Sequence, residues 1–87
     1  MTEDELIKII NDSMISEFEM ESGAMVPSAH LIDDLGMDSL DFVDLIVVLQ
    51  EAFGVKFRED PRVKELETLE DLHKLVILKK EEMENKD

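Results

Sequence analysis

The chain has 87 residues and no cysteine, and its 23 acidic against nine basic side chains give a formal net charge of −14. This length supports one domain with a modest core and excludes a deep catalytic cavity combined with a separate substrate domain. The negative charge excludes nucleic acid and anionic membranes as partners, and the lack of cysteine excludes a disulfide, a thiolate metal site and a thiol nucleophile.

Residues 3–18 carry the first predicted helix. Thr2, with Glu5 three residues later, is a capping-box start. Apolar side chains then recur at steps of one to four residues that place them on one face of a helix: Leu6, Ile7, Ile10, Met14 and Phe18. This face is predicted to enter the core.

A long loop is predicted between this helix and residue 38. The turn-forming pairs Ser22-Gly23 and Pro27-Ser28 interrupt it. Loops of this length are uncommon unless they are functional. Apolar side chains of the loop are expected to pack on the helices, because burial of apolar surface is favourable. They are Met25, Val26, Leu31, Ile32 and Leu35.

The second predicted helix runs from Ser39 to Phe53 and ends at Gly54, a residue suited to the left-handed turn after a helix. Its core stripe is predicted to be Leu45, Ile46, Leu49 and Phe53. The helix has more apolar residues than one buried face requires. The surplus either packs against neighbouring helices in a small bundle or forms an exposed apolar surface.

Asp60-Pro61, an N-cap followed by a first-turn proline, predicts a short third helix near residues 61–66. Thr68 and Asp71 open a fourth helix with apolar residues on its inner face. Residues 1–78 are therefore interpreted as one all-α domain, a four-helix bundle with a long loop between its first two helices. Residues 79–87 form a charged tail that is expected to be a frayed helical extension or, by preference, disordered.

Ser39 stands at the start of the second helix, behind the Gly36 turn. Asp38 is suited to cap this helix, because short polar side chains accept hydrogen bonds from backbone N–H groups that have no helical partner. Asp41 adds negative charge to the first turn. The free N–H groups and the helix dipole also favour an anionic group, so a phosphodiester on Ser39 would suit this position.

At these residues the sequence resembles the acyl carrier protein family. The resemblance is carried by the run Asp34-Leu35-Gly36-Met37-Asp38-Ser39-Leu40-Asp41, followed by an acidic apolar helix that ends at Phe53-Gly54, and it extends from about Leu6 to about Val76. It implies the same order of helices and a covalent 4'-phosphopantetheine, taken from coenzyme A, on Ser39. The protein would then hold acyl intermediates as thioesters and perform no chemistry itself.

The resemblance also implies roles for neighbouring residues. Asp38 and Asp41 would help to present Ser39 to a phosphopantetheinyl transferase. Residues of the second helix would contact acyl-transferring and chain-elongating enzymes through basic patches on those enzymes: Leu40, Asp41, Asp44, Val47 and Glu51. The surplus apolar residues of the second helix have two interpretations: they are surrounded by the small bundle, or Leu40, Val43 and Val47, with Leu66 and Leu69, line a cleft for an acyl chain or dock on an enzyme.

The distribution of charge agrees with docking to basic partners. Residues 1–55 hold 13 acidic and one basic side chain, whereas residues 56–87 hold 10 acidic and eight basic ones, and no Lys or Arg occurs between Lys8 and Lys56. Such a field steers association with basic partners at a rate that falls with added salt. The acidic N-terminal residues and the lack of a long apolar run predict a cytoplasmic monomer without stable membrane binding.

Several alternatives stay open at this point. Gln50 and Leu31 depart from the pattern of fatty-acid carriers, so a carrier for a specialised lipid or polyketide pathway is as well supported as one for fatty-acid synthesis. A D-alanyl or peptidyl carrier and an unmodified acidic docking module also remain. An enzyme is disfavoured because Ser39 lacks the Gly-x-Ser-x-Gly elbow. A calcium loop counted from Asp34 fails, because Leu45 stands where its bidentate glutamate belongs.

Overall fold

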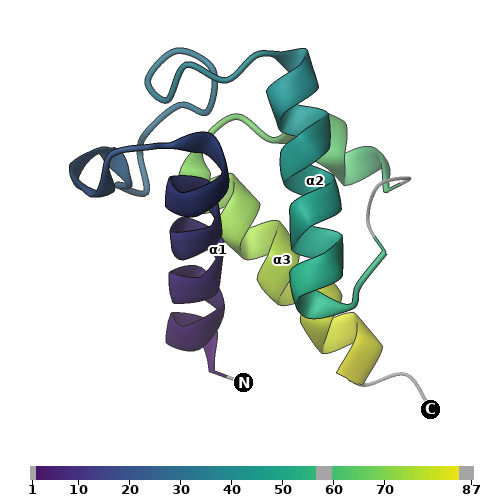
Figure 1. Cartoon of the computed structure of the whole chain (residues 1–87). Helices are drawn as coiled ribbons and strands as arrows, with labels where there is room; N and C mark the ends of the chain where they lie inside the picture. The colour runs from purple at the N-terminus through teal and green to yellow at the C-terminus, as the bar shows by residue number, and fades with distance from the viewer. Residues whose placement is uncertain (1, 57–59, 85–87) are drawn as a thin grey trace.

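The computed structural model describes residues 2–56 and 60–84 and consists of helices joined by loops (Figure 1). Its elements are α1 (Glu3–Phe18), the short 3-10 helix η1 (Ser22–Ala24), α2 (Ser39–Phe53), the 3-10 helix η2 (Pro61–Glu65) and α3 (Leu69–Glu84). The predicted all-α class is confirmed. α1 packs against both α2 and α3, and Figure 1 shows α3 passing behind the other two helices.

The ends of α1 and α2 follow from their caps. The Glu5 N–H donates to Thr2 Oγ1 at 3.2 Å, so α1 starts where the capping box predicts. Gly54 adopts the left-handed conformation with φ 67°, and its N–H donates to the Gln50 carbonyl at 2.8 Å. These contacts satisfy backbone groups that a helix end leaves without partners.

The third predicted helix is a 3-10 helix and not an α-helix, so the described residues contain three α-helices. Its backbone hydrogen bonds join residues three apart, from Val63 N–H to the Asp60 carbonyl at 3.1 Å and from the Leu66 N–H to the Val63 carbonyl at 3.3 Å. The segment starts with Pro61, which has no N–H to donate, and it ends after five residues. Short 3-10 pieces of this length are common as connectors.

The core takes one stripe from each α-helix. The four residues predicted to form the α2 stripe are all buried: Leu45, Ile46, Leu49 and Phe53. They meet Leu6, Ile10 and Met14 of α1 and Leu69, Leu72, Leu75 and Val76 of α3. In the long loop Leu31 is buried, and Met25 and Leu35 pack on the core. Val26 and Ile32 are exposed, so the prediction that they pack on the helices is wrong.

The last helix extends further than its apolar stripe. Residues 79–84, expected to be frayed or disordered, continue α3 as far as Glu84. Two lysines join this part of α3 to other elements. Lys80 Nζ donates to the Phe53 carbonyl at 3.3 Å, and Lys79 Nζ lies 3.3 Å from Asp60 Oδ2. Residues 85–87 of the predicted tail lie outside the described residues. Within residues 2–56 and 60–84, no helix combines the length and apolar content that a bilayer span requires.

The long loop is attached to the N-terminus of α3 by backbone hydrogen bonds. His30 and Thr68 form an isolated antiparallel bridge. Around it the Leu31 N–H donates to the Glu67 carbonyl at 2.8 Å, and the Leu69 N–H donates to the Ala29 carbonyl at 2.9 Å. These bonds place the segment that leads to Ser39 against the start of α3.

A buried polar pair joins α1 to α3. His73 is buried, and its Nε2 lies 2.8 Å from Asn11 Oδ1, which fits a neutral imidazole that donates to the amide oxygen. Burial lowers the pKa of His73, and the Glu70 carboxylate opposes this effect only in part. The folded protein therefore holds this histidine neutral to lower pH than the unfolded chain does.

This lowered pKa makes the stability pH-dependent. The contribution of His73 is fully present above the pKa of an unfolded histidine, about 6.5, and is lost as the pH falls through the lower folded pKa, because only the unfolded state gains the proton. We expect the free energy of unfolding of the native chain to fall, as the pH is lowered, relative to that of His73→Gln. Glutamine keeps a donor for Asn11 but does not titrate. Urea denaturation of both proteins from pH 8 to pH 5 measures this, and parallel curves would contradict it.

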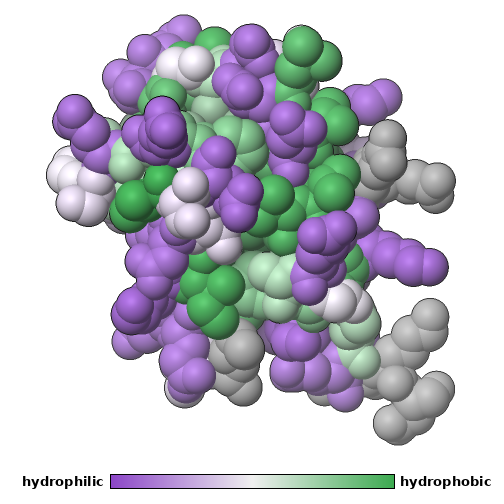
Figure 2. Space-filling model, viewed as in Figure 1, coloured by the Kyte–Doolittle hydropathy of each residue, from purple (hydrophilic) through white to green (hydrophobic). Residues whose placement is uncertain are grey.

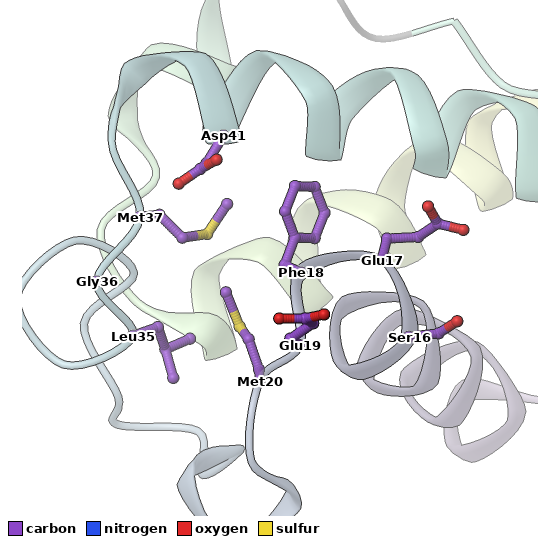
Figure 3. Close-up of a pocket in the computed structure, with 9 residues that line it drawn as sticks. All are labelled: Ser16, Glu17, Phe18, Glu19, Met20, Leu35, Gly36, Met37 and Asp41. Atoms are coloured by element: carbon purple, nitrogen blue, oxygen red, sulfur yellow. The ribbon is translucent and has the colours of Figure 1, made fainter.

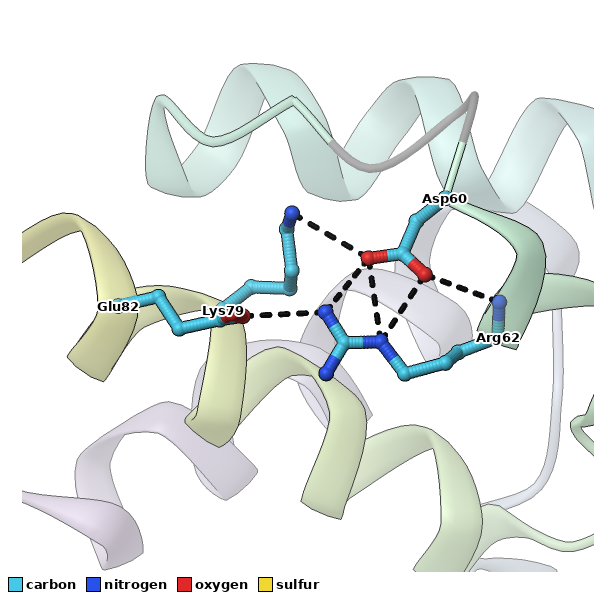
Figure 4. Close-up of polar contacts among 4 residues, drawn as sticks. All are labelled: Asp60, Arg62, Lys79 and Glu82. Atoms are coloured by element: carbon cyan, nitrogen blue, oxygen red, sulfur yellow. Dashed lines mark hydrogen bonds and ion pairs between the residues drawn. The ribbon is translucent and has the colours of Figure 1, made fainter.

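An ion-pair network attaches η2 to α3 (Figure 4). Arg62 Nη2 lies 2.6 Å from Asp60 Oδ2 and 3.0 Å from Glu82 Oε1, and Lys79 approaches the same Asp60 oxygen. The Arg62 guanidinium and backbone N–H hold the pKa of Asp60 far below its usual range, while partial burial opposes this. One carboxylate thus ties the start of η2 to the last turns of α3.

Asp60→Asn removes this charge while the amide oxygen can still accept from the Arg62 N–H. We expect the urea midpoint to fall at pH 7, since Arg62 and Lys79 lose their shared anion. Adding Arg62→Gln to Asp60→Asn should then change the midpoint less than Arg62→Gln does alone, because contacts that share a partner are not additive. Additive effects would show that the network does not act as a unit.

Candidate functional site

Ser39 is the first residue of α2, at the end of the helix that meets the long loop (Figure 1). The residue is exposed, and within residues 2–56 and 60–84 no hydrogen bond involves its hydroxyl. Neither histidine is available to it as a base: His73 is paired with Asn11, and His30 Nδ1 accepts the N–H groups of Ile32 and Asp33 at 3.2 Å each. The hydroxyl is therefore presented to solvent.

Asp38 caps α2 as the sequence predicts. Its Oδ1 accepts the Asp41 N–H at 2.8 Å, and Asp41 Oδ2 accepts the Asp38 N–H at 3.3 Å, which completes a reciprocal capping box. The N–H groups of Ser39 and Leu40 belong to the first turn, where the helix itself supplies no acceptor. The positive end of the helix dipole thus lies beside the Ser39 hydroxyl.

The turn before the motif is held by its own backbone. The N–H groups of Asp34 and Leu35 both donate to the His30 carbonyl, at 2.9 and 3.0 Å, and the Met37 N–H donates to the Leu31 carbonyl at 3.1 Å. Gly36 adopts the left-handed conformation with φ 71°. Met37 is buried. Ser39 therefore follows a turn whose two sides are fixed, one by hydrogen bonds and one by packing.

The face of α2 beyond Ser39 combines exposed apolar and acidic side chains. Leu40 is 75% exposed and Val43 46% exposed, although both are large and apolar. Figure 2 shows apolar side chains gathered over α2, with hydrophilic ones around them. Asp44 and Glu51 are exposed, and Val47 is half-buried. Steps of four, three and four residues place Leu40, Asp44, Val47 and Glu51 on one face of the helix.

The predicted cleft on α2 is only partly open. Leu69 is completely buried in the core and Leu66 is half-buried. Leu40 and Val43 are the members of this set that face solvent, with Val47 between the two environments. Among the described residues, no group of three His, Cys, Asp or Glu side chains is arranged to hold a metal ion.

Sequence reasoning missed a hollow on the other side of the Ser39 turn. It lies between the last turn of α1 and the Gly36 turn and reaches Asp41 of α2. Part of its lining comes from residues 19–20, whose direction depends on a left-handed backbone at Glu19, with φ 55°. The only sequence signal was the run of acids Glu17, Glu19 and Glu21 with no base nearby.

Comparison with known proteins adds to this geometry. The family described as "Phosphopantetheine attachment site" matches residues 10–76. The acyl carrier protein AcpXL of Mesorhizobium japonicum is 44% identical over 55 residues, 63% of this chain and 55% of that protein. The acyl carrier protein AcpXL of Brucella melitensis is 40% identical over 47 residues, 54% of this chain and 50% of that protein. The chain spans about half the length of the curated relatives it matches.

The left-handed backbone of Gly36 is the basis of one prediction. Gly36→Ala should lower the free energy of unfolding by about 1 kcal/mol, because a Cβ disfavours this conformation even where no other atom is near. Gly23→Ala is the matched control, since that glycine also has open space around its Cβ position but no positive φ. Urea denaturation measures both variants, and an equal loss in the two would refute the explanation by backbone conformation.

Proposed function

Because this chain belongs to the acyl carrier protein family, we propose that Ser39 is the residue that carries its 4'-phosphopantetheine and that the loaded chain holds acyl intermediates as thioesters. The observation that carries the proposal is the exposed hydroxyl at the first position of α2 behind an Asp38–Asp41 capping box. Carrier proteins of this family present cargo and are not catalysts. The proposed role of this chain is likewise presentation.

The residues around Ser39 fit a phosphodiester. The first-turn N–H groups and the helix dipole favour an anion at this position. The Asp38 carboxylate is occupied as an acceptor for the Asp41 N–H, at 2.8 Å, so it stabilises the helix end on which the hydroxyl stands. When bound, the group supplies the thiol that a chain without cysteine lacks.

The surface of α2 supports a docking role toward basic enzymes. Leu40 and Val43 offer an exposed apolar contact beside Ser39, and Asp44 and Glu51 offer exposed carboxylates further along the helix. A mixed surface of this kind fits a partner with a basic patch around an apolar centre. We propose that the phosphopantetheinyl transferase and the acyl-transferring and chain-elongating enzymes use this face.

We propose that the pathway is either fatty-acid synthesis or a specialised lipid or polyketide pathway. Fatty-acid synthesis and a specialised lipid or polyketide pathway both use carriers with this attachment motif. The similar proteins named acyl carrier protein AcpXL support an acyl cargo over an aminoacyl one.

The proposal is tested by intact mass. The purified chain is incubated with coenzyme A and a broad-specificity phosphopantetheinyl transferase. We expect the native chain to gain one phosphopantetheine, Ser39→Ala to gain none, and Ser28→Ala, an exposed serine of the loop, to gain it as the native chain does. Circular dichroism should show the same helix content in the native chain and in both variants. Both serines are exposed, and the Ser39 hydroxyl makes no hydrogen bond within the described residues.

Two results would overturn the assignment. A mass gain by Ser39→Ala would move the attachment to another residue. No gain by a folded native chain would favour an unmodified acidic module that acts only by docking.

A further inference from the structure

A histidine caps the turn that leads into α2. Nδ1 of His30 accepts the N–H groups of Ile32 and Asp33 at 3.2 Å each, and the His30 N–H donates to Asp34 Oδ2 at 2.7 Å. This reciprocal pairing resembles the Asp38–Asp41 capping box, with an imidazole in place of the first carboxylate. The turn is therefore closed at its start by a side chain that can change its charge near neutral pH.

The capped turn sets the place of the Ser39 hydroxyl. Figure 3 shows the chain passing through Gly36 and Met37 into the first turn of α2. The Met37 N–H donates to the Leu31 carbonyl at 3.1 Å, and both of these side chains are buried. Only Asp38 stands between Met37 and Ser39. A change in the conformation of the turn is therefore passed on to the serine within two residues.

The cap requires a His30 ring without a proton on Nδ1. A ring nitrogen that accepts N–H groups has a free lone pair, so the neutral ring carries its proton on Nε2. A proton on Nδ1 removes the acceptor and leaves donors facing donors. The His30 side chain is 33% exposed, whereas His73 is buried. A proton can therefore reach the His30 ring without unfolding of the chain.

The charged groups around this ring on its own side of the fold are carboxylates. Asp33 Oδ2 lies 3.8 Å from Nδ1, and Asp34 already accepts the His30 N–H. Beyond the end of α1, Glu19 and Glu21 line a hollow together with Asp34. Among these acids, Asp33 is the one within reach of a protonated Nδ1.

The start of α3 supplies further charges, because the His30–Thr68 bridge joins the two segments. They are Glu67, Glu70, Asp71 and Lys74. Glu70 and Lys74 pair with each other at 2.7 Å, and Asp71 Oδ2 accepts the Thr68 N–H at 3.1 Å. The short distance to Nδ1 again makes Asp33 the alternative partner of the ring.

We propose that His30 is a positioning residue for the modification of Ser39 and that protonation of His30 slows this modification. The neutral ring holds the turn. The protonated ring pairs with Asp33 Oδ2, and the N–H groups of Ile32 and Asp33 turn to water. The turn then samples other conformations, so a transferase meets the hydroxyl in its ordered place for a smaller part of the time. The inference rests on the proposed function, since it concerns how Ser39 is offered to the transferase.

The first test measures kcat and KM of phosphopantetheine transfer to the unmodified chain at pH 8. His30→Ala removes the acceptor, and we expect KM for the chain to rise roughly threefold with kcat unchanged, because binding restores the ordered turn. His30→Asn should return KM to the native value, because asparagine is a good cap. Ser28→Ala, an exposed residue two positions earlier in the loop, is the control and should keep the native KM.

The second test repeats the measurement at pH 6. We expect KM of the native chain to rise roughly twofold or more relative to that of His30→Asn, which caps without titrating. The ratio between the two chains cancels the pH dependence of the transferase and the contribution of His73, which both chains share. Circular dichroism at pH 6 checks that both chains stay folded.

The third test does not depend on loading. NMR of the ¹⁵N-labelled, unmodified chain reads the tautomer of His30 and the exchange of amide protons with water. At pH 8 we expect the tautomer with its proton on Nε2. The amides of Ile32 and Asp33 should exchange faster in His30→Ala than in His30→Asn, because only alanine leaves them without an acceptor.

Three results would overturn the inference. They are a neutral His30 ring with its proton on Nδ1, equal KM in His30→Ala and His30→Asn, and a native-to-His30→Asn ratio of KM that is the same at pH 8 and pH 6. Failure of the proposed function has a different signature, which is no mass gain in any of the chains, whereas failure of this inference leaves all of them loaded with equal KM.

Discussion

The backbone hydrogen bonds between residues 27–31 and the start of α3 determine where Ser39 stands. The Leu31 N–H bonds to the Glu67 carbonyl, and the N–H groups of Leu69 and Glu70 bond back to Ala29 and Pro27 at 2.9 Å each. These bonds satisfy N–H groups that the first turn of α3 would otherwise leave without partners. They also anchor the long loop between α1 and α2 to the start of α3 at residues 27–31. Because residues 27–31 lead directly into the Gly36 turn, the first turn of α2 is held in two ways. The anchored loop holds it from the N-terminal side, and packing of the α2 stripe in the core holds it from the C-terminal side.

The same arrangement explains how one helix can have both a buried stripe and exposed apolar side chains. α2 buries Leu45 and Leu49 completely, yet Leu40 remains 75% exposed. The exposed part, with Leu40 and Val43, lies at the end of α2 that the long loop leads into. Apolar side chains left open there cost little in a chain of high net charge, which disfavours self-association. Ser39, the exposed apolar side chains and the acidic side chains can thus share one helix without competing for the same face.

Charge is divided along the chain for a structural reason. Two basic residues of the second half, Arg62 and Lys79, hold η2 and the end of α3 together through Asp60, so their charge is used inside the molecule. The first half has one base, Lys8, which pairs with Asp12 at 2.9 Å. The carboxylates around Ser39 and at the end of α1 therefore keep their field for other molecules. The first half of the sequence therefore keeps a large excess of negative charge, whereas the second half is nearly balanced.

The sequence by itself determined the helix ends and the motif position, because caps and glycine turns act within a few residues: Thr2 with Glu5 starts α1, Asp38 with Asp41 starts α2, and Gly54 ends it. Hydrophobic spacing likewise identified the buried stripe of α2. Tertiary structure decided what depends on distant partners. Arg62 and Lys79 meet at Asp60, α3 extends to Glu84, and Val26 and Ile32 are exposed. The left-handed backbone at Glu19 turns Met20 toward Met37 (Figure 3). Such contacts join residues whose separation in the chain no local pattern encodes.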